Sequence, residues 1–208
     1  PWKDKPRPSL VNNWEATYFK FDTEKLLDIA RTAAGRGIEM LVLDDGWFGC
    51  RDTDTNSLGD WVVNEKKLPG GLKYLADEVN KLGMKFGLWV EPEMVCPDSN
   101  LFRAHPDYAL QIPGRPPMLS RTQLVLDLSR KEVRDCIYDQ LRKVLSSANI
   151  EYVKWDMNRP LTDVASFCLE GERQGELFHR YVLGVYELQE RILTDFPHLL
   201  LENCASGG

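Results

Sequence analysis

The 208-residue sequence lacks the features that mark several large classes of protein. It has no apolar run long enough to cross a bilayer and no charged-then-apolar leader at its start. Its formal net charge is −6, with both signs mixed along the chain and no concentrated basic face. A nucleic acid or an anionic membrane would favour such a face. We therefore expect a soluble protein that binds neither nucleic acid nor membrane.

Metal-binding and redox patterns are also missing. The chain has three histidines without H-x-H or H-E-x-x-H spacing, so we expect no metal site and no cofactor. Its five cysteines are widely spaced, odd in number and contain no C-x-x-C pair. This pattern favours reduced thiols and a cytoplasmic location, although an extracellular protein with one free thiol is an alternative.

Short apolar runs rich in β-formers alternate with segments of helical periodicity. The runs that predict strands are 10–19, 38–47, 85–92, 123–129, the stretch that begins at 150, and 199–203. The segments that predict helices are 22–37, 71–83, 99–106, 131–149 and 176–196. Apolar strands separated by helices imply a parallel sheet covered on both faces, either a doubly wound sheet or a (β/α)8 barrel.

Polar residues at the ends of several different strands favour the barrel. Functional groups of a barrel gather at the carboxyl ends of many strands, whereas a doubly wound fold concentrates its site at one switch point with a Gly-rich turn. No G-x-G-x-x-G sequence is present. The prediction is an α/β fold, a (β/α)8 TIM-barrel catalytic domain truncated after about six β/α units. Residues 10–208 would form the partial barrel, and residues 1–9 would be a linker from a missing preceding domain.

The sequence K-W-D at 154–156 is the strongest chemical signal. Strand side chains alternate, so Lys154 and Asp156 share one face. A nearby lysine favours an ionised carboxylate, which is what a carboxylate nucleophile in retaining glycoside hydrolysis requires. The alternative is a structural ion pair at the mouth of a barrel.

Other strand ends carry groups that suit a sugar. Asp44 and Asp45 can accept hydrogen bonds from neighbouring hydroxyls, although either one can also cap a loop. Arg121 is an available donor, or a solvated loop arginine. Three tryptophans offer apolar ring faces for a pyranose, with core packing as the alternative for each: Trp14, Trp47 and Trp89.

Six motifs in order resemble one known family. They are VNNWEATYF, LDDGWFG, GLWVEPEMV, LVLDLSR, VKWDMNR and ENCASGG. Together they resemble the catalytic barrel of glycoside hydrolase family 36, the α-galactosidases often called melibiases, from about Val11 to Gly208.

The resemblance implies a retaining hydrolase that removes terminal α-linked galactose from melibiose- and raffinose-type galactosides. Asp156 would be the nucleophile, Lys154 would contact the sugar, and Asp44 and Asp45 would bind the hydroxyls at C4 and C6. Further positions that match the galactose pocket of the family are Trp14, Trp89, Arg121, Asn158, Cys204 and Gly207.

The resemblance also implies what lies outside the chain. The family's acid/base is an aspartate in a Trp-Ser-Asp-like motif beyond the CASGG turn, and its β-sandwich and C-terminal β-domains are not present here. We therefore expect the isolated segment to be inactive. Bacterial members are often tetramers, which makes a homotetrameric parent an implication of the resemblance.

Three other functions fit parts of the same pattern. A raffinose-type α-galactosyltransferase shares much of this machinery, because acceptor choice depends on outer subsites. A barrel aldolase would use Lys154 as a Schiff-base nucleophile and Asp156 as its proton shuttle. A non-enzymatic reading is a sugar-binding scaffold or an inactive barrel remnant.

Overall fold

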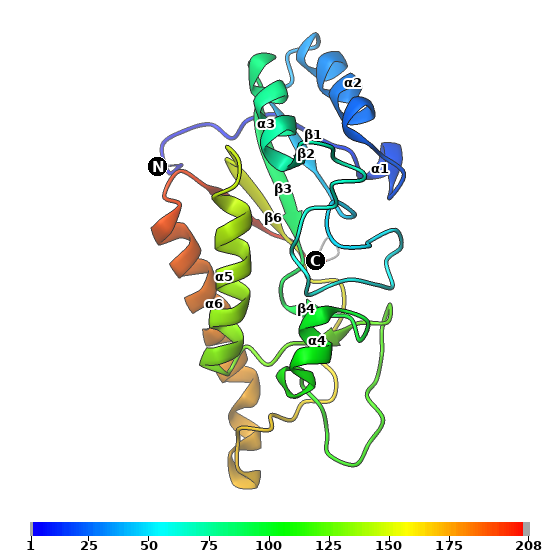
Figure 1. Cartoon of the computed structure of the whole chain (residues 1–208). Helices are drawn as coiled ribbons and strands as arrows, with labels where there is room; N and C mark the ends of the chain where they lie inside the picture. Colours follow the sequence, from blue (N-terminus) through cyan, green and yellow to red (C-terminus); the bar gives the residue numbers. More distant parts are fainter. Residues whose placement is uncertain (1, 206–208) are drawn as a thin grey trace.

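The computed structural model describes residues 2–205, and its centre is a five-stranded parallel sheet (Figure 1). The strands are β1 (Leu10–Asn12), β2 (Met40–Leu43), β3 (Lys85–Val90), β6 (Tyr152–Trp155) and β7 (Leu200–Asn203). They lie in the order β1-β2-β3-β6-β7, and every adjacent pair is parallel. The order follows the chain without reversal, so this sheet has no switch point of the doubly wound type.

The long helices cover one face of this sheet. They are α2 (Thr23–Ala34), α3 (Gly71–Lys81), α5 (Lys131–Leu145) and α6 (Leu177–Asp195). Leu41, Phe86 and Val153 on the strands share one buried core with apolar residues of these helices. Helices α5 and α6 pack side by side, as Figure 1 shows to the left of the sheet.

The opposite face of the sheet has its own apolar cluster. Met40, Val42 and Tyr152 are buried there, with Leu200 packed against them. Helices on one face, and a second cluster on the face that a barrel encloses, are the arrangement of a (β/α)8 barrel rather than of a doubly wound sheet. The predicted α/β fold with a partial barrel is confirmed.

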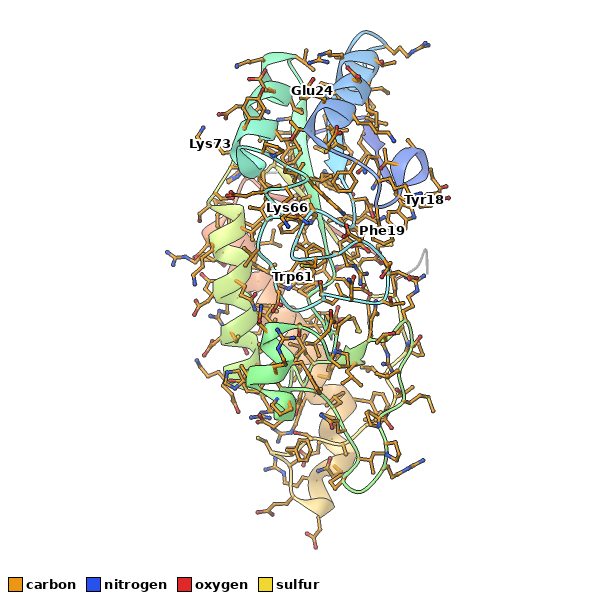
Figure 2. All side chains as sticks on the ribbon, turned by 45° about the vertical axis from the view of Figure 1, so that its right-hand side comes forward. Tyr18, Phe19, Glu24, Trp61, Lys66 and Lys73 are labelled. Carbon is orange, nitrogen blue, oxygen red and sulfur yellow. The ribbon has the colours of Figure 1, made fainter. Side chains whose placement is uncertain are left out.

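Irregular segments complete the interior near the carboxyl ends of the strands. Trp61 lies inside the molecule in Figure 2, in contact with the rings of Trp47, Phe48 and Trp89. Lys73, on α3, points outward in the same view. The long segment 48–70 therefore contributes to the core as well as to the surface.

The predicted strand at 123–129 does not belong to the parallel sheet. Its only strand is β5 (Leu124–Val125), which pairs antiparallel with β4 (Met94–Val95) in a separate two-stranded sheet. Backbone N–H groups beside this ladder bond within the same loop region, as in Leu126 N to Glu93 O at 2.8 Å. The main sheet thus has five strands among the described residues, one fewer than predicted.

The predicted strand at 10–19 is also too long. Strand β1 ends at Asn12, and α1 (Trp14–Thr17) follows. Asparagine side chains compete for backbone groups at this point. The Trp14 N–H donates to Asn12 Oδ1 at 2.7 Å, and the Asp44 N–H donates to Asn13 Oδ1 at 2.8 Å. These bonds end the strand and turn Trp14 toward the end of the sheet that carries Asp44.

The predicted helices are confirmed, with shorter ends. Helix α2 begins after Asp22, whose side chain accepts a hydrogen bond from the Lys25 N–H at 2.9 Å, as expected for an N-cap. Ser99 caps α4 (Asn100–Ala104) by accepting from the Phe102 N–H. Two short 3-10 helices are η1 (Pro106–Tyr108) and η2 (Gly171–Glu176).

Residues 2–9 form neither helix nor strand. The Trp2 indole donates to His198 O at 2.9 Å, and the Ser9 N–H donates to Glu39 Oε2 at 2.8 Å, so this segment is held near the amino ends of the strands. Within residues 2–205, none of the helices combines the length and the apolarity that crossing a membrane requires.

Gly184 sets how closely α6 approaches the chain before α5. A Cβ at this position would lie 1.9 Å from Leu128 O, a backbone atom that cannot rotate away. We expect Gly184→Ala to lower the free energy of unfolding by about 1–3 kcal/mol, because the helix must move outward. Chemical denaturation measures this.

Gly175→Ala is the matched control, since nothing lies within 4 Å of its added Cβ. It should change the stability by less than about 0.5 kcal/mol. Equal stabilities for the two variants would contradict the close packing of α6.

Candidate active site

The register of β3 and β6 brings the key side chains together. Trp89 and Lys154 are register partners in the parallel ladder. Asp156 follows β6, and its N–H continues the ladder by donating to Val90 O at 2.8 Å. Lys154 and Asp156 face the inner side of the sheet, while Trp155 is buried toward the helices, where its indole donates to Glu93 Oε1 at 2.9 Å. The predicted alternation is confirmed.

Asp156 is a buried carboxylate surrounded by hydrogen-bond donors. Its side chain accepts from the Trp89 indole at 3.0 Å and from Asn158 Nδ2 at 2.9 Å, both at Oδ2, and from the Met157 N–H at 3.0 Å at Oδ1. Burial opposes its charge, but the bonds from Trp89, Asn158 and Cys204 and the charge of Lys154 together hold the pKa of Asp156 below its ordinary value. The carboxylate is therefore ionised at neutral pH.

Lys154 is paired with Asp44 across the site. Its Nζ lies 3.2 Å from Asp44 Oδ2, which also accepts from Asn12 Nδ2 at 2.5 Å. Burial lowers the pKa of Lys154, but the charge and hydrogen bond of Asp44, reinforced by Asp156, raise it above its ordinary value overall. The side chain is a stable ammonium, whereas a Schiff-base lysine must lose its proton to attack.

Asp45 is held by a cation that the sequence did not single out. Arg51 has no exposed surface, and its guanidinium donates to both oxygens of Asp45, with Nη2 to Oδ2 at 2.8 Å and Nε to Oδ1 at 3.0 Å. Burial opposes the guanidinium charge, but the bonds and charge of Asp45 raise the pKa of Arg51. This buried fork fixes the orientation of Asp45.

A cavity of about 460 Å³ joins these groups, which is within the usual size of small-molecule sites. Its lining contains eight of the ten predicted residues: Trp14, Asp44, Asp45, Arg121, Lys154, Asp156, Asn158 and Cys204. Glu15 and Asp54 line it as well and were not predicted. Glu15 adjoins the predicted Trp14, whereas nothing in the local sequence marks Asp54.

The remaining two predicted positions are Trp89 and Gly207. Trp89 is 1% exposed and does not line the cavity, so its link to the site is the indole bond to Asp156 rather than an open ring face. Gly207 lies outside the described residues. Trp47, a weaker candidate, is fully buried, and its indole donates to Trp89 O at 2.8 Å. The core-packing alternative is therefore correct for Trp47.

The two long loops supply the rim of the cavity. Asp54 comes from segment 48–70, and Arg121 comes from segment 92–122, with 3.8 Å between Arg121 Nε and Asp54 Oδ2. Arg121 and Thr122 both have positive φ, 51° and 57°, a strained backbone for residues other than glycine. Strain of this kind clusters at functional sites.

A second cavity of about 540 Å³ lies between β1 and α2. Its lining is mainly apolar and includes none of the polar groups at the strand ends, so we place the chemistry in the smaller cavity. Residues 2–205 contain no group of three or more histidines, cysteines or carboxylates arranged to hold a metal ion.

The fold is that of a partial (β/α) barrel, and the candidate side chains lie at the carboxyl ends of β2, β3 and β6, where barrels of this type carry their active sites. A family model described as Melibiase matches residues 1–208. The chain belongs to the melibiase family.

The names of similar proteins support this family assignment. The α-galactosidase AgaA of Geobacillus stearothermophilus is 58% identical over 207 residues, 100% of this chain and 28% of that protein. Its crystal structure, named as a GH36 enzyme, gives a TM-score of 0.97 at 58% identity, covering 98% of this chain and 28% of that one. A variant of AgaA in complex with raffinose gives 0.96 at 57% identity, with the same coverages. The chain thus spans about 28% of the length of these relatives.

Arg51→Met should lower the free energy of unfolding by about 3–5 kcal/mol, because it leaves the carboxylate of Asp45 buried without its partner. Chemical denaturation measures the loss. The control is Arg31→Met, which breaks an exposed ion pair to Asp28 and should cost no more than about 0.5 kcal/mol. Similar losses for both variants would show that the buried Asp45–Arg51 pair does not stabilise the fold.

Proposed function

We propose that this chain provides the nucleophile and most of the sugar-binding groups of a retaining α-galactosidase that hydrolyses raffinose-type galactosides. The observation that carries the proposal is the carboxylate of Asp156, buried and ionised among donors in a polar cavity. A carboxylate nucleophile requires such an environment. The name of AgaA and its complex with raffinose support the choice of sugar.

The proposed reaction is a double displacement. An oxygen of Asp156 attacks C1 of the α-galactoside and forms a β-galactosyl ester, while the bond from C1 to the leaving oxygen breaks and that oxygen takes a proton from an acid. Water then attacks C1, gives its proton to the same group acting as base, and releases galactose and the free carboxylate. The acid/base would lie about 5 Å from Asp156 and come from sequence beyond residue 208.

Sugar recognition would use the pairs that surround the cavity. Asp44 and Asp45 would accept hydrogen bonds from the hydroxyls at C4 and C6, with Lys154 and Arg51 fixing their orientation. Axial O4 is what separates galactose from glucose, so these fixed acceptors would provide the selectivity. Trp14, Arg121, Asn158, Cys204 and Gly207 would complete the pocket, with Trp89 holding the nucleophile.

Other parts of the proposal concern the complete protein. We place it in the cytoplasm, which the five free cysteines support, and as a homotetramer, which only the family resemblance supports. Residues 1–208 alone would be inactive, because the acid/base is supplied from outside. Transfer to a sugar acceptor would use the same nucleophile, while the raised pKa of Lys154 counts against a Schiff-base aldolase.

Asp156→Gly tests the nucleophile in the full-length protein that contains this chain. We expect kcat on an aryl α-galactoside to fall more than about 10⁴-fold, as for other enzymes that lose a covalent nucleophile. Azide, which fits the space left by the carboxylate, should restore turnover and yield β-galactosyl azide, identified by NMR. Asp127→Gly is the control, since Asp127 is buried against Ser129 and Ser166 and does not line the cavity. Azide rescue of the control, or α-galactosyl azide from Asp156→Gly, would contradict the proposal.

A further inference from the structure

The turn that carries Asp156 is held from both neighbouring strands. On the β3 side, the Asp156 N–H donates to Val90 O at 2.8 Å. On the β7 side, the Met157 N–H donates to Cys204 O at 3.0 Å. The Asn158 N–H donates to Glu91 Oε1 at 2.5 Å, which is a side-chain oxygen rather than a backbone carbonyl. Glu91, which directly follows β3, thus supplies an acceptor for the next N–H of the turn after the strand itself has ended.

The end of strand β3 explains why a side chain is needed as the acceptor for the Asn158 N–H. Strand β3 ends at Val90, and the backbone turns at once, with Glu91 O accepting from the Met94 N–H. Strand β3 therefore has no further ladder carbonyl to accept from the Asn158 N–H, which is the third N–H of the turn 156–158. A part-buried N–H without an acceptor costs free energy, and here the carboxylate of Glu91 accepts from the Asn158 N–H.

Glu91 differs from the other buried glutamate in the same loop. Glu93 uses both of its oxygens for structure, accepting from the Trp155 indole at 2.9 Å and from the Tyr181 hydroxyl at 2.5 Å. Glu91 has no exposed surface, and its only side-chain hydrogen bond among the described residues is to Asn158, with Oε2 unpartnered there. Among the described residues, the side chain of Glu91 thus bonds only to the turn that carries Asp156.

We infer that Glu91 is a positioning residue for the nucleophile, which holds the Asn158 backbone so that the Asn158 amide stays bonded to Asp156. This inference rests on the proposed function, because it takes Asp156 as the reacting carboxylate. Asn158 Nδ2 is one of the donors that keep Asp156 ionised. Loss of the backbone anchor would move this donor and weaken the support of the charge.

Burial raises the pKa of Glu91 to about 7; the Asn158 N–H and Arg51 oppose the rise, and Asp156 and Asp45 add to it. Cys96 is a further titratable group close to Arg51 and Glu91. In its neutral form Glu91 still accepts from Asn158 through its carbonyl oxygen, and it places no second negative charge beside Asp156. Glutamine reproduces this form in length and in hydrogen bonding.

The test compares Glu91→Gln with Glu91→Asp in the full-length protein that contains this chain. Gln keeps the reach of the acceptor and removes the charge, whereas Asp keeps the charge and is one methylene too short. We expect Glu91→Gln to keep at least about a third of kcat, and Glu91→Asp to lose about 10²-fold, as a displaced catalytic group does. KM should change little, because the Asp44–Lys154 pair remains in place.

The decisive readout is the acidic limb of the pH profile of kcat/KM. Glu91→Asp should move this limb upward by at least about half a pH unit, since Asp156 loses a donor, and Glu91→Gln should leave it in place. Glu93→Gln is the matched control; it should lower Tm and leave the limb unchanged. Activity is divided by the number of active sites that react with a covalent inhibitor, an activated fluorinated galactosyl donor. Partly unfolded protein then does not count as lost catalysis.

An acidic limb and a kcat in Glu91→Asp equal to those of the wild type would overturn the inference. A 10²-fold loss in Glu91→Gln would do so too, and this result is decisive even if the Asp variant does not fold. Neither result contradicts the proposed function as long as the covalent inhibitor labels Asp156. If the covalent inhibitor labels another residue in the wild-type protein, that result contradicts the proposed function itself.

Discussion

The rest of the site depends on keeping one carboxylate charged in a buried position. Asp156 is 6% exposed, and burial by itself would favour its neutral form. The indole of Trp89, the amide of Asn158 and the ammonium of Lys154 reverse that preference. Each of these groups is in turn held by its own neighbouring residues, so the site extends well beyond the cavity lining.

The parallel sheet provides that fixation. Adjacent strands run in the same direction and in register, so their carboxyl ends place Asp44, Trp89 and Lys154 next to each other. In residues 2–205 the long helices pack on one face of the sheet, which leaves the other face for inward-pointing side chains. Met40, Val42 and Tyr152 fill this inner face below the polar groups. The apolar layer supports the site from beneath, as in barrels generally.

Much of this could be predicted from local sequence, because periodicity is a local property. Helices α2, α3, α5 and α6 and strands β2, β3, β6 and β7 have the expected pattern, and eight of the ten predicted site residues line one cavity. The segment 123–129 is different, because its pairing is not a local property. Leu124–Val125 has the composition of a sheet strand, but its partner is chosen by distant contacts, and it pairs with β4 instead.

Missed site residues have the same explanation. Arg51 and Asn12 act through contacts with Asp45 and Asp44, which lie 6 and 32 positions away along the chain. No spacing rule links such pairs. The role of Trp89 is similar: composition predicts an aromatic face, whereas the fold buries the ring and uses its N–H. Residue types could be predicted from the sequence, but the partners that define their roles could not.

The proposed mechanism depends on a covalent bond between Asp156 and the sugar. The most direct measurement treats the full-length protein with an activated fluorinated galactosyl donor and locates the label by peptide mass spectrometry. We expect one galactosyl adduct per site, on Asp156, absent in Asp156→Ala. Label on another carboxyl, such as Asp127 or Glu91, would contradict it. So would no label in an enzyme that still turns over α-galactosides.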